Sequence, residues 1–430
     1  MRHSHQRFLD TLFVSAMILY VVAGMMLAPF HGDESTIIHK SRDWYLLLQG
    51  NLAALYYQPT PTDPAEQELR LVNGVTSAYG MGIAAMLIGV PSQDINEQWL
   101  WGADWKYNLE NRHIPSSQLL FSTRLSSTLM IIVSVALVFT IARWLGGRGS
   151  AWLATLIYAT MPALLLNGRR AMFEGATMLS IALVMAAGLA IARHIQWSKR
   201  GNLWIYWLLF GAVSGFGLAS KHTLIVTILP IVVALLFVAR RDLKRTVGYA
   251  LAAGITALMI FLTLNPAWWS APFTVPREVI RLRQNLLAGQ TEFYGGYTNT
   301  QDRVVELVSA VMEAPQYYED KHGWPEWIGP QITSYDRSGV GGIAWSRVAS
   351  LALVVITGGV WLVPGIRKPQ NMVVFLSVFL FSLFAIFWLT PVAWQRYYLP
   401  LAALWAIAYG LSLNAAGQVV LRLVRSRYAR

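Results

Sequence analysis

The stretch from residue 10 to residue 35, DTLFVSAMILYVVAGMMLAPFHGDES, joins a long apolar run directly to two adjacent acids. The apolar part, residues 10–30, is long enough to cross the roughly 30 Å hydrocarbon core of a bilayer as a helix. Asp33 and Glu34 follow within a few residues of its end. This order predicts a membrane protein that places carboxylates where its chain leaves the bilayer.

Apolar runs of this kind recur along all 430 residues, of which 55% are hydrophobic and 13% are charged. We expect one membrane-embedded domain, residues 1–430, with an all-α polytopic fold of about ten transmembrane helices plus juxtamembrane helices. The predicted spans are residues 10–30, 119–142, 150–166, 174–192, 204–220, 222–239, 248–265, 345–363, 371–390 and 397–415.

The composition also excludes several classes of chemistry and partner. The chain has no cysteine, which excludes disulfides, thiolate nucleophiles and Cys-ligated metal centres. A net charge of +12 would indicate a nucleic-acid partner in a soluble protein, but in a membrane protein basic residues first report orientation. We therefore expect membrane lipids, and no nucleic acid, among its partners.

The basic residues decide whether the shorter apolar stretch 75–90 crosses the membrane. If it does not cross, every basic cluster falls on one side; if it does, the cluster at 240–245 moves to the other side, against the positive-inside rule. We therefore predict that 75–90 is a juxtamembrane helix. The clusters are Arg2 with Arg7, Arg143 with Arg148, 193–200, 240–245, Arg367 with Lys368, and 422–430.

This orientation predicts a multi-pass plasma-membrane protein with both termini in the cytoplasm. The first apolar run is longer than the roughly 7–15-residue core of a secretory signal, so we interpret it as a retained span. Two large segments, 31–118 and 266–344, then lie on the extracytoplasmic face, and we expect the chemistry there.

Asp33 and Glu34 have two interpretations. The residues after them, 35–46, carry apolar side chains at helical spacing, so the acids can stabilise the start of a surface helix through its dipole. Alternatively, one carboxylate is a general base that removes the proton of an attacking sugar hydroxyl. The residues themselves leave both open.

The aromatic residues of the outer segments are equally open to two interpretations. Asp104 lies among Trp99, Trp101 and Trp105. Such aromatic side chains anchor a protein at the lipid headgroups, or they form a carbohydrate platform on which sugar rings pack. Trp268 begins the second segment, whose Trp, Tyr and Gly content is typical of a lid, an acceptor cleft or a structural cap.

Polar and basic residues gather at the predicted outer ends of the spans, where the positive-inside rule disfavours cations. Each one alone is explained by a long side chain that extends to the membrane surface. Together they favour an anionic ligand at the bilayer edge, with phosphate as the first candidate. The residues are Arg124, Arg169, Arg170, Glu174, Lys221, His222, Arg396 and Tyr397.

Several nucleotide and metal motifs are missing from the sequence. It has no Walker loop, no convincing Gly-rich dinucleotide turn, no Asp-x-Asp for a metal-bound sugar nucleotide and no His-Glu-x-x-His. His31, His39 and His222 can approach a metal with the carboxylates, but no spacing demands it. We expect no required cofactor and assign no metal ligand, while a divalent metal stays open.

Short motifs follow one another in an order that is informative as a set. Asp33-Glu34 comes after the first span, and Asn265-Pro266 begins the second large outer segment. The others are Arg124-Leu125-Ser126-Ser127, Arg170-Ala171-Met172-Phe173-Glu174, Gly217-Leu218-Ala219-Ser220-Lys221 and Arg396-Tyr397-Tyr398-Leu399-Pro400. The arrangement resembles the GT-C class of integral membrane glycosyltransferases, specifically the branch of protein O-mannosyltransferases and lipid A aminoarabinose transferases.

The resemblance implies transfer of a sugar, such as a mannose-like hexose, from a polyprenyl-phosphate donor with inversion at the anomeric carbon. It implies Asp33 as the general base, with Glu34 orienting or assisting it. It further implies that Arg169, Arg170, Lys221 and Arg396 bind the donor phosphate and stabilise the leaving group. Arg124, Asp104, Glu174, His222, Trp268 and Tyr397 are further substrate or supporting residues. The acceptor is a lipid, a glycan or a protein.

Two other functions compete with this interpretation. A transporter or lipid flippase would place ionisable residues near mid-span and show matched broken helices in two halves. In this sequence the charges collect at the outer ends of the predicted spans instead. A noncatalytic subunit with the same fold would share every motif, so only activity distinguishes it.

Overall fold

The computed structural model describes residues 2–197, 202–317, 324–362 and 370–428, which are mostly helical with no strand among them. The basic residues at 199–200 and 367–368 lie outside this described part. The helices of the membrane bundle are α1 (Arg2–Ala23), α7 (Ser117–Ala159), α8 (Pro162–Arg169), α9 (Glu174–Gln196), α10 (Leu203–Ser220), α11 (Ile225–Val238), α12 (Leu243–Leu264), α16 (Arg347–Leu362), α17 (Gln370–Leu389) and α18 (Ala402–Tyr428).

Shorter elements connect these helices. The α-helices are α2 (Gly32–Lys40), α3 (Arg42–Leu48), α4 (Pro64–Val72), α5 (Thr76–Leu87), α6 (Trp105–Glu110), α13 (Val275–Tyr294), α14 (Thr300–Ser309) and α15 (Pro325–Arg337). The 3-10 turns are η1 (Leu52–Leu55), η2 (Ser92–Asp94), η3 (His222–Leu224), η4 (Arg240–Asp242), η5 (Pro266–Trp268) and η7 (Gln395–Leu401).

The predicted all-α membrane fold is confirmed, and each predicted span coincides with helix over most of its length within the described residues. Within the described residues, seven helices are long and apolar enough to cross a membrane, and two shorter apolar helices cover 222–238 and 347–361. The expected spans 119–142 and 150–166 lie on either side of a break in α7, and the second continues from α7 into α8. Gly147, with φ 81° and ψ −168°, breaks the helix between them in a conformation that glycine adopts without a Cβ clash.

The stretch 75–90 forms α5, a helix of 12 residues. At 1.5 Å per residue it extends about 18 Å, which is too short for the hydrocarbon core. Its length agrees with the prediction of a juxtamembrane helix, and it packs against α7, α2 and α3.

The core of the bundle lies where α7, α9 and α18 meet, around buried side chains such as Val138, Leu189 and Trp405. Small residues let other pairs approach closely. Gly211 and Gly215, four residues apart on α10, face Ala253 and Ala257 of α12 without room for a Cβ atom. Because apolar side chains gain little by leaving lipid, such close backbone packing stabilises membrane bundles.

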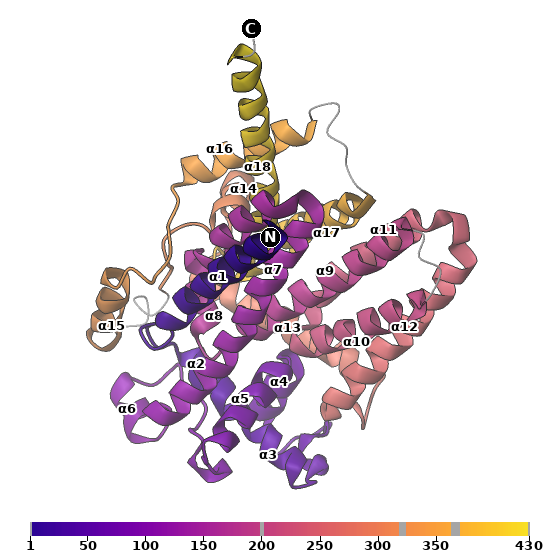
Figure 1. Cartoon of the computed structure of the whole chain (residues 1–430). Helices are drawn as coiled ribbons and strands as arrows, with labels where there is room; N and C mark the ends of the chain where they lie inside the picture. Colours follow the sequence, from indigo (N-terminus) through magenta and orange to yellow (C-terminus); the bar gives the residue numbers. More distant parts are fainter. Residues whose placement is uncertain (1, 198–201, 318–323, 363–369, 429–430) are drawn as a thin grey trace.

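The two segments 31–118 and 266–344 contact each other. Figure 1 shows α2 to α6 gathered at one end of the bundle, opposite the end where α18 leaves it. Tyr57 N–H donates to Ala267 O at 3.3 Å, and α13 packs on α4. The contacts place η5 and α13, at the start of the second segment, beside the first segment.

Candidate active site

Helix α2 begins at the acidic pair and is fixed by its own first turn. His31 is the N-cap: its Nδ1 accepts from Asp33 N–H at 3.0 Å, and its N–H donates to Glu34 Oε1 at 3.2 Å. Gly32 lies so close to the Trp99 indole that a Cβ atom would be 2.6 Å from the ring. Since successive helical residues point about 100° apart, Asp33 and Glu34 face different surroundings.

Glu34 points into the protein and is fully buried. Arg124 donates to both of its oxygens, from Nε to Oε2 at 2.8 Å and from Nη2 to Oε1 at 2.7 Å. Ala171 N–H donates to Oε2 at 2.9 Å. Burial alone would raise the pKa of Glu34, but Arg124 and these hydrogen bonds outweigh it and hold the pKa below its ordinary value. We call Glu34, Arg124 and Ala171 the buried lock, because they join α2, α7 and the turn between α8 and α9.

Asp33 points the other way, into a cavity, and its side chain is 26% exposed. The Arg396 guanidinium contacts its carboxylate, and His31 Nδ1 lies 3.8 Å away. Burial would raise the pKa of Asp33, but Arg396, with His31 and Arg170, holds it below the ordinary value. Asp33 is therefore a charged carboxylate at the wall of a cavity.

This cavity, which we call the site cavity, has a volume of about 340 Å³. Its walls come from α2, the start of α9, the α10–η3 turn, α13 and η7. The polar residues that line it are His31, Asp33, Thr36, Asn73, Glu174, Lys221, Arg283, Gln290 and Arg396, together with Trp101, Tyr294, Trp394 and Tyr397. Acids and bases distant in sequence thus share one chamber.

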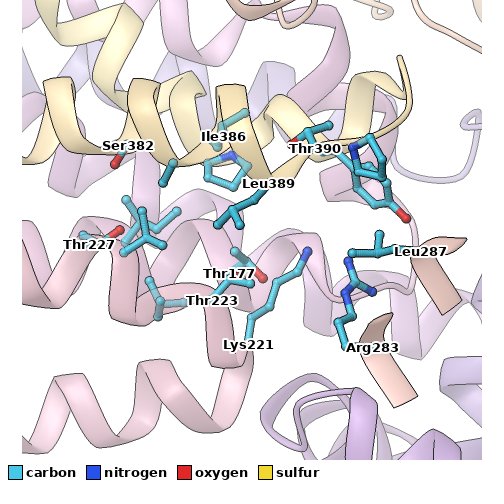
Figure 2. A pocket seen from close by; sticks show the side chains of 17 residues that line it. Thr177, Lys221, Thr223, Thr227, Arg283, Leu287, Ser382, Ile386, Leu389 and Thr390 are labelled. Atoms are coloured by element: carbon cyan, nitrogen blue, oxygen red, sulfur yellow. The ribbon is translucent and has the colours of Figure 1, made fainter. Parts of the chain in front are cut away.

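A second, mostly apolar cavity of about 100 Å³ continues from it between α9, α11 and α17. Lys221, Arg283 and Tyr397 line both cavities. Figure 2 shows Lys221 and Arg283 extending toward the segment that carries Leu389 and Thr390. We call this second cavity the apolar groove; its cations stand where it joins the site cavity.

Backbone contacts position the cations. Lys221 follows α10, whose end is held by Val75 N–H donating to Ala219 O at 2.7 Å and Thr76 Oγ1 donating to Ser220 Oγ at 2.7 Å. Burial, with Arg283 and Arg396 nearby, lowers the pKa of Lys221, while Glu174 opposes the shift.

Two η7 residues, Arg396 and Tyr397, contact Asp33 and α13 respectively. Arg396 lies 5.1 Å from the Trp394 ring centroid as a cation–π contact, and Tyr397 Oη donates to Gln290 Oε1 at 2.7 Å. Glu174 is 5% exposed, and its Oε2 has no hydrogen-bond partner within the described ranges. It is therefore an acceptor directed at the cavity.

Other predicted residues lie elsewhere. Arg169 is fully buried and donates to Val21 O and Tyr20 O, both at 2.7 Å, so it fastens α8 to α1 and does not line the cavity. Arg170 is also fully buried and donates from Nε to Pro29 O at 2.9 Å. Arg124 belongs to the buried lock.

His222, Trp268 and Asp104 are also outside the site cavity. The His222 ring packs against Trp268 at 5.8 Å, beside Phe261. Asp104 is exposed and caps α6 by accepting from Tyr107 N–H at 2.7 Å. Of the predicted set, the cavity brings together Asp33, Glu174, Lys221, Arg396 and Tyr397.

Sequence reasoning missed the contribution of α13. Arg283, Leu286, Gln290 and Tyr294 line the cavity from one face of this helix. Their spacing of three or four residues in the outer segment was the available signal, since such residues share a helical face. His31, Trp101 and Trp394 also line the cavity and were not assigned to it.

Among the described residues, the histidines that the sequence offered as metal ligands approach single carboxylates, as His31 approaches Asp33 and His39 approaches Glu97, both at 3.8 Å. Across the described ranges, no group of three or more His, Asp or Glu side chains gathers closely enough to hold a metal ion. His31 instead caps α2, and His39 Nδ1 lies 3.2 Å from Asn96 O.

Comparison with known proteins finds similarity in part of the sequence and in the fold. Residues 83–279, just under half of the chain, match the family model of dolichyl-phosphate-mannose-protein mannosyltransferase. The undecaprenyl phosphate-alpha-4-amino-4-deoxy-L-arabinose arabinosyl transferase 1 of Sodalis glossinidius (strain morsitans) is 29% identical over 164 residues, which cover 36% of this chain and 29% of that protein.

Two solved structures share the fold over almost the whole chain. ArnT from Cupriavidus metallidurans bound to undecaprenyl phosphate gives a TM-score of 0.53 at 13% identity, covering 98% of this chain and 63% of that one. The archaeal oligosaccharyltransferase AglB from Archaeoglobus fulgidus, in complex with an inhibitory peptide and a dolichol-phosphate, gives a TM-score of 0.57 at 13% identity. This match covers 99% of this chain and 52% of that one. The chain thus spans less than two thirds of each relative.

The chain is a multi-pass membrane protein that shares the GT-C fold of these two structures. Within that class its sequence is similar to the mannosyltransferase family and to the aminoarabinose transferase named above.

Proposed function

We propose that this protein transfers a glycosyl group from a polyprenyl-phosphate donor to a hydroxyl of an acceptor. The observation that carries the proposal is the site cavity, in which a carboxylate, Asp33, faces Lys221, Arg283 and Arg396 at the mouth of an apolar groove. An apolar tail, a phosphate and a sugar are the three parts of such a donor. Each finds matching chemistry in order along the two cavities.

The polyprenyl chain occupies the apolar groove, lined by residues such as Ile181, Leu224 and Ile386. Burial of its methylene groups against these side chains is favourable, as it is within lipid. Lys221 and Arg283 then hold the phosphate at the junction of the two cavities. Both are basic side chains that can donate hydrogen bonds to phosphate oxygens, and a bound phosphate favours the protonated form of Lys221.

The sugar projects from the phosphate into the site cavity, beside Asp33. The acceptor oxygen attacks the anomeric carbon from the face opposite the phosphate, and the new C–O bond forms as the bond to the phosphate oxygen breaks. Asp33 takes the hydroxyl proton, and the electron pair of the broken bond leaves on polyprenyl phosphate. The three cations stabilise the growing phosphate charge, and the configuration inverts.

Arg396 contributes to both halves of this reaction. It contacts Asp33 in this structure and lines the same cavity as Lys221. A donor phosphate competes with the carboxylate for the guanidinium. When Arg396 turns to the phosphate, Asp33 loses its counter-charge, its pKa rises, and it becomes a stronger base.

Membrane topology follows the charge distribution. The basic clusters, including Arg143, Arg148 and 240–245, favour a cytoplasmic location for both termini. The site cavity and segments 31–118 and 266–344 then lie on the extracytoplasmic face of the plasma membrane. The donor sugar is a hexose such as mannose or an amino pentose, because the similar proteins use both kinds, and the acceptor is a lipid, a glycan or a protein.

The test is donor consumption by purified wild-type protein in nanodiscs, with a panel of radiolabelled polyprenyl-phosphate sugars and a membrane extract as acceptor source. We expect one donor to release polyprenyl phosphate and to label the extract. Binding of polyprenyl phosphate without consumption of any donor would overturn the proposal and favour a noncatalytic subunit. Movement of intact donor across a bilayer would favour a flippase.

A further inference from the structure

A second cleft, about 390 Å³ in volume, lies beside the site cavity. It is formed by the loop and helix start at 101–106 and by the beginning of α15. Its lining residues are Trp101, Gly102, Ala103, Asp104, Trp105, Lys106, Trp324 and Trp327. We call it the tryptophan cleft; none of its residues has a role in the reaction described above except through Trp101.

The cleft has a rigid aromatic base. Trp99, Trp105 and Trp324 are buried, with 2%, 8% and 4% of their surfaces exposed. They pack edge to face, with Trp99 and Trp324 centroids 5.0 Å apart. Edge-to-face packing of this kind is the preferred arrangement of aromatic rings, so the base is preorganised.

Two further indoles are exposed on this base. Trp101 is 41% exposed and stacks on Trp324 with an interplanar angle of 30°; Trp327 is 48% exposed and stacks on Trp105 at 10°. Indoles that serve only as membrane anchors need no common cleft. Here the two exposed rings are supported from beneath and line one hollow, which suits a ligand with flat apolar faces.

Polar groups stand at the rim of the same hollow. The Asp104 carboxylate can accept hydrogen bonds, and the Lys106 ammonium, whose side chain is 75% exposed, can donate them. Apolar faces beside a donor and an acceptor match a sugar ring, which presents C–H groups on its faces and hydroxyls at its edges. The opposite charges of Asp104 and Lys106 favour a neutral ring.

Trp101 connects the cleft to the acidic pair, because it also lines the site cavity. Its ring meets the His31 ring at 5.7 Å between centroids, edge to face. His31 caps the helix that carries Asp33. The tryptophan cleft and the site cavity therefore adjoin at Trp101, beside the helix that carries Asp33.

We propose that the tryptophan cleft binds a neutral glycan acceptor, holding the sugar ring next to the one that receives the transferred group. This inference rests on the proposed function and names the acceptor class. Trp101 and Trp327 are the faces on which the ring packs, and Asp104 and Lys106 bind its hydroxyls.

The test measures glycan binding by calorimetry to wild-type protein in nanodiscs without donor. The probes are maltohexaose, cellohexaose and N-acetylchitohexaose, which differ in the faces they present. We expect at least one to bind, and Trp101→Ala or Trp327→Ala to weaken it roughly three- to tenfold each, as expected for loss of one aromatic contact. Trp327→Phe should restore most of the affinity.

Trp269→Ala is the matched control, since Trp269 is 42% exposed but packs on Tyr56 outside the cleft. Its glycan affinity should equal that of wild type. Absence of binding by all three probes, or equal weakening by Trp269→Ala, would overturn the inference. Thermal unfolding of each variant separates lost binding from lost folding.

Donor consumption distinguishes this inference from the proposed function. If wild type consumes donor but the cleft variants bind glycan normally, the tryptophan cleft is not the glycan site, while the proposed transferase function is retained. If glycan binds through Trp101 and Trp327 while no donor is ever consumed, the cleft stands and the transferase fails.

Discussion

The two neighbouring acids of α2 belong to opposite regions of the molecule. Glu34 is inside the buried lock, where both oxygens are hydrogen-bonded and water is excluded. Asp33 faces the site cavity and has Arg396 as its counter-charge. The same chemical group, one residue apart, therefore holds the fold in one region and remains available for reaction in the other.

The cations divide in the same way. Arg124 and Arg169 are buried among carbonyl and carboxylate oxygens, whereas Lys221 and Arg283 line two cavities. A charge whose partners are all supplied by the protein has little to offer a ligand. A basic residue at the end of a span is therefore not necessarily a ligand contact. The direction of its side chain decides whether it can reach a ligand.

The largest effect is expected from breaking the buried lock. Arg124→Ala leaves Glu34 charged and buried without its ion-pair partner, which typically costs about 3–5 kcal/mol of folding free energy. Denaturant or thermal unfolding in detergent measures the loss. Lys106→Ala, which removes an exposed partner 3.7 Å from Glu110, is the control and should cost less than about 1 kcal/mol. Equal stability of the two variants would refute the lock.

A smaller effect is expected from removing one cation of the cavities. Lys221→Gln and Arg283→Gln should each lower kcat/KM for the donor by roughly 10- to 100-fold, because a hydrogen bond to a charged group contributes about 1.5–3 kcal/mol. Initial rates over a donor concentration series provide the measurement. Arg277→Gln, on the same helix α13 but exposed and outside both cavities, should behave as wild type. Similar losses of kcat/KM in all three variants would show that the effect comes from general surface charge and not from the cavity cations.

Arg169→Gln tests the opposite case, a buried cation that lines neither cavity. It loses buried hydrogen bonds to Val21 O and Tyr20 O, so we expect it to lower stability by about 1–3 kcal/mol. The donor KM of the remaining folded protein should stay within about twofold of wild type, a change worth only about 0.4 kcal/mol. If Arg169→Gln raised the donor KM as much as Lys221→Gln does, Arg169 would have to be assigned to the phosphate site.

The smallest effect is a pH dependence of stability. The pKa of Glu34 is lower in the folded protein than its ordinary 4.5, so the stability that this carboxylate contributes is present above about pH 4.5 and is lost as the pH falls toward the folded value. The contribution of Glu34 to the unfolding temperature should therefore be constant between pH 7 and about pH 5, and the unfolding temperature should decrease at lower pH. The Glu34→Gln variant should have a lower unfolding temperature at pH 7 and a shallower decline in acid. An unchanged decline would show that other groups cause the loss of stability in acid.

Sequence reasoning predicted the helical spans well because each apolar run needs only length and composition to be recognised. It also placed Asp33, Lys221 and Arg396 at one end of the bundle. It did not separate Arg169 from the cavity residues, because adjacent residues at a turn point in directions that only packing fixes. Arg283 was missed because the outer segment was read by composition rather than by helical spacing. The apolar runs placed a boundary between 142 and 150, but composition does not reveal the conformation of Gly147 that breaks the helix there.

The most direct test of the division between the two acids is donor turnover by Asp33→Asn per folded molecule, with its unfolding temperature measured on the same preparation. We predict that turnover falls by roughly 10²- to 10⁴-fold, the usual contribution of a general base, while the unfolding temperature stays close to that of wild type. Turnover near the wild-type level in well-folded Asp33→Asn would contradict the account, because another group would then accept the proton.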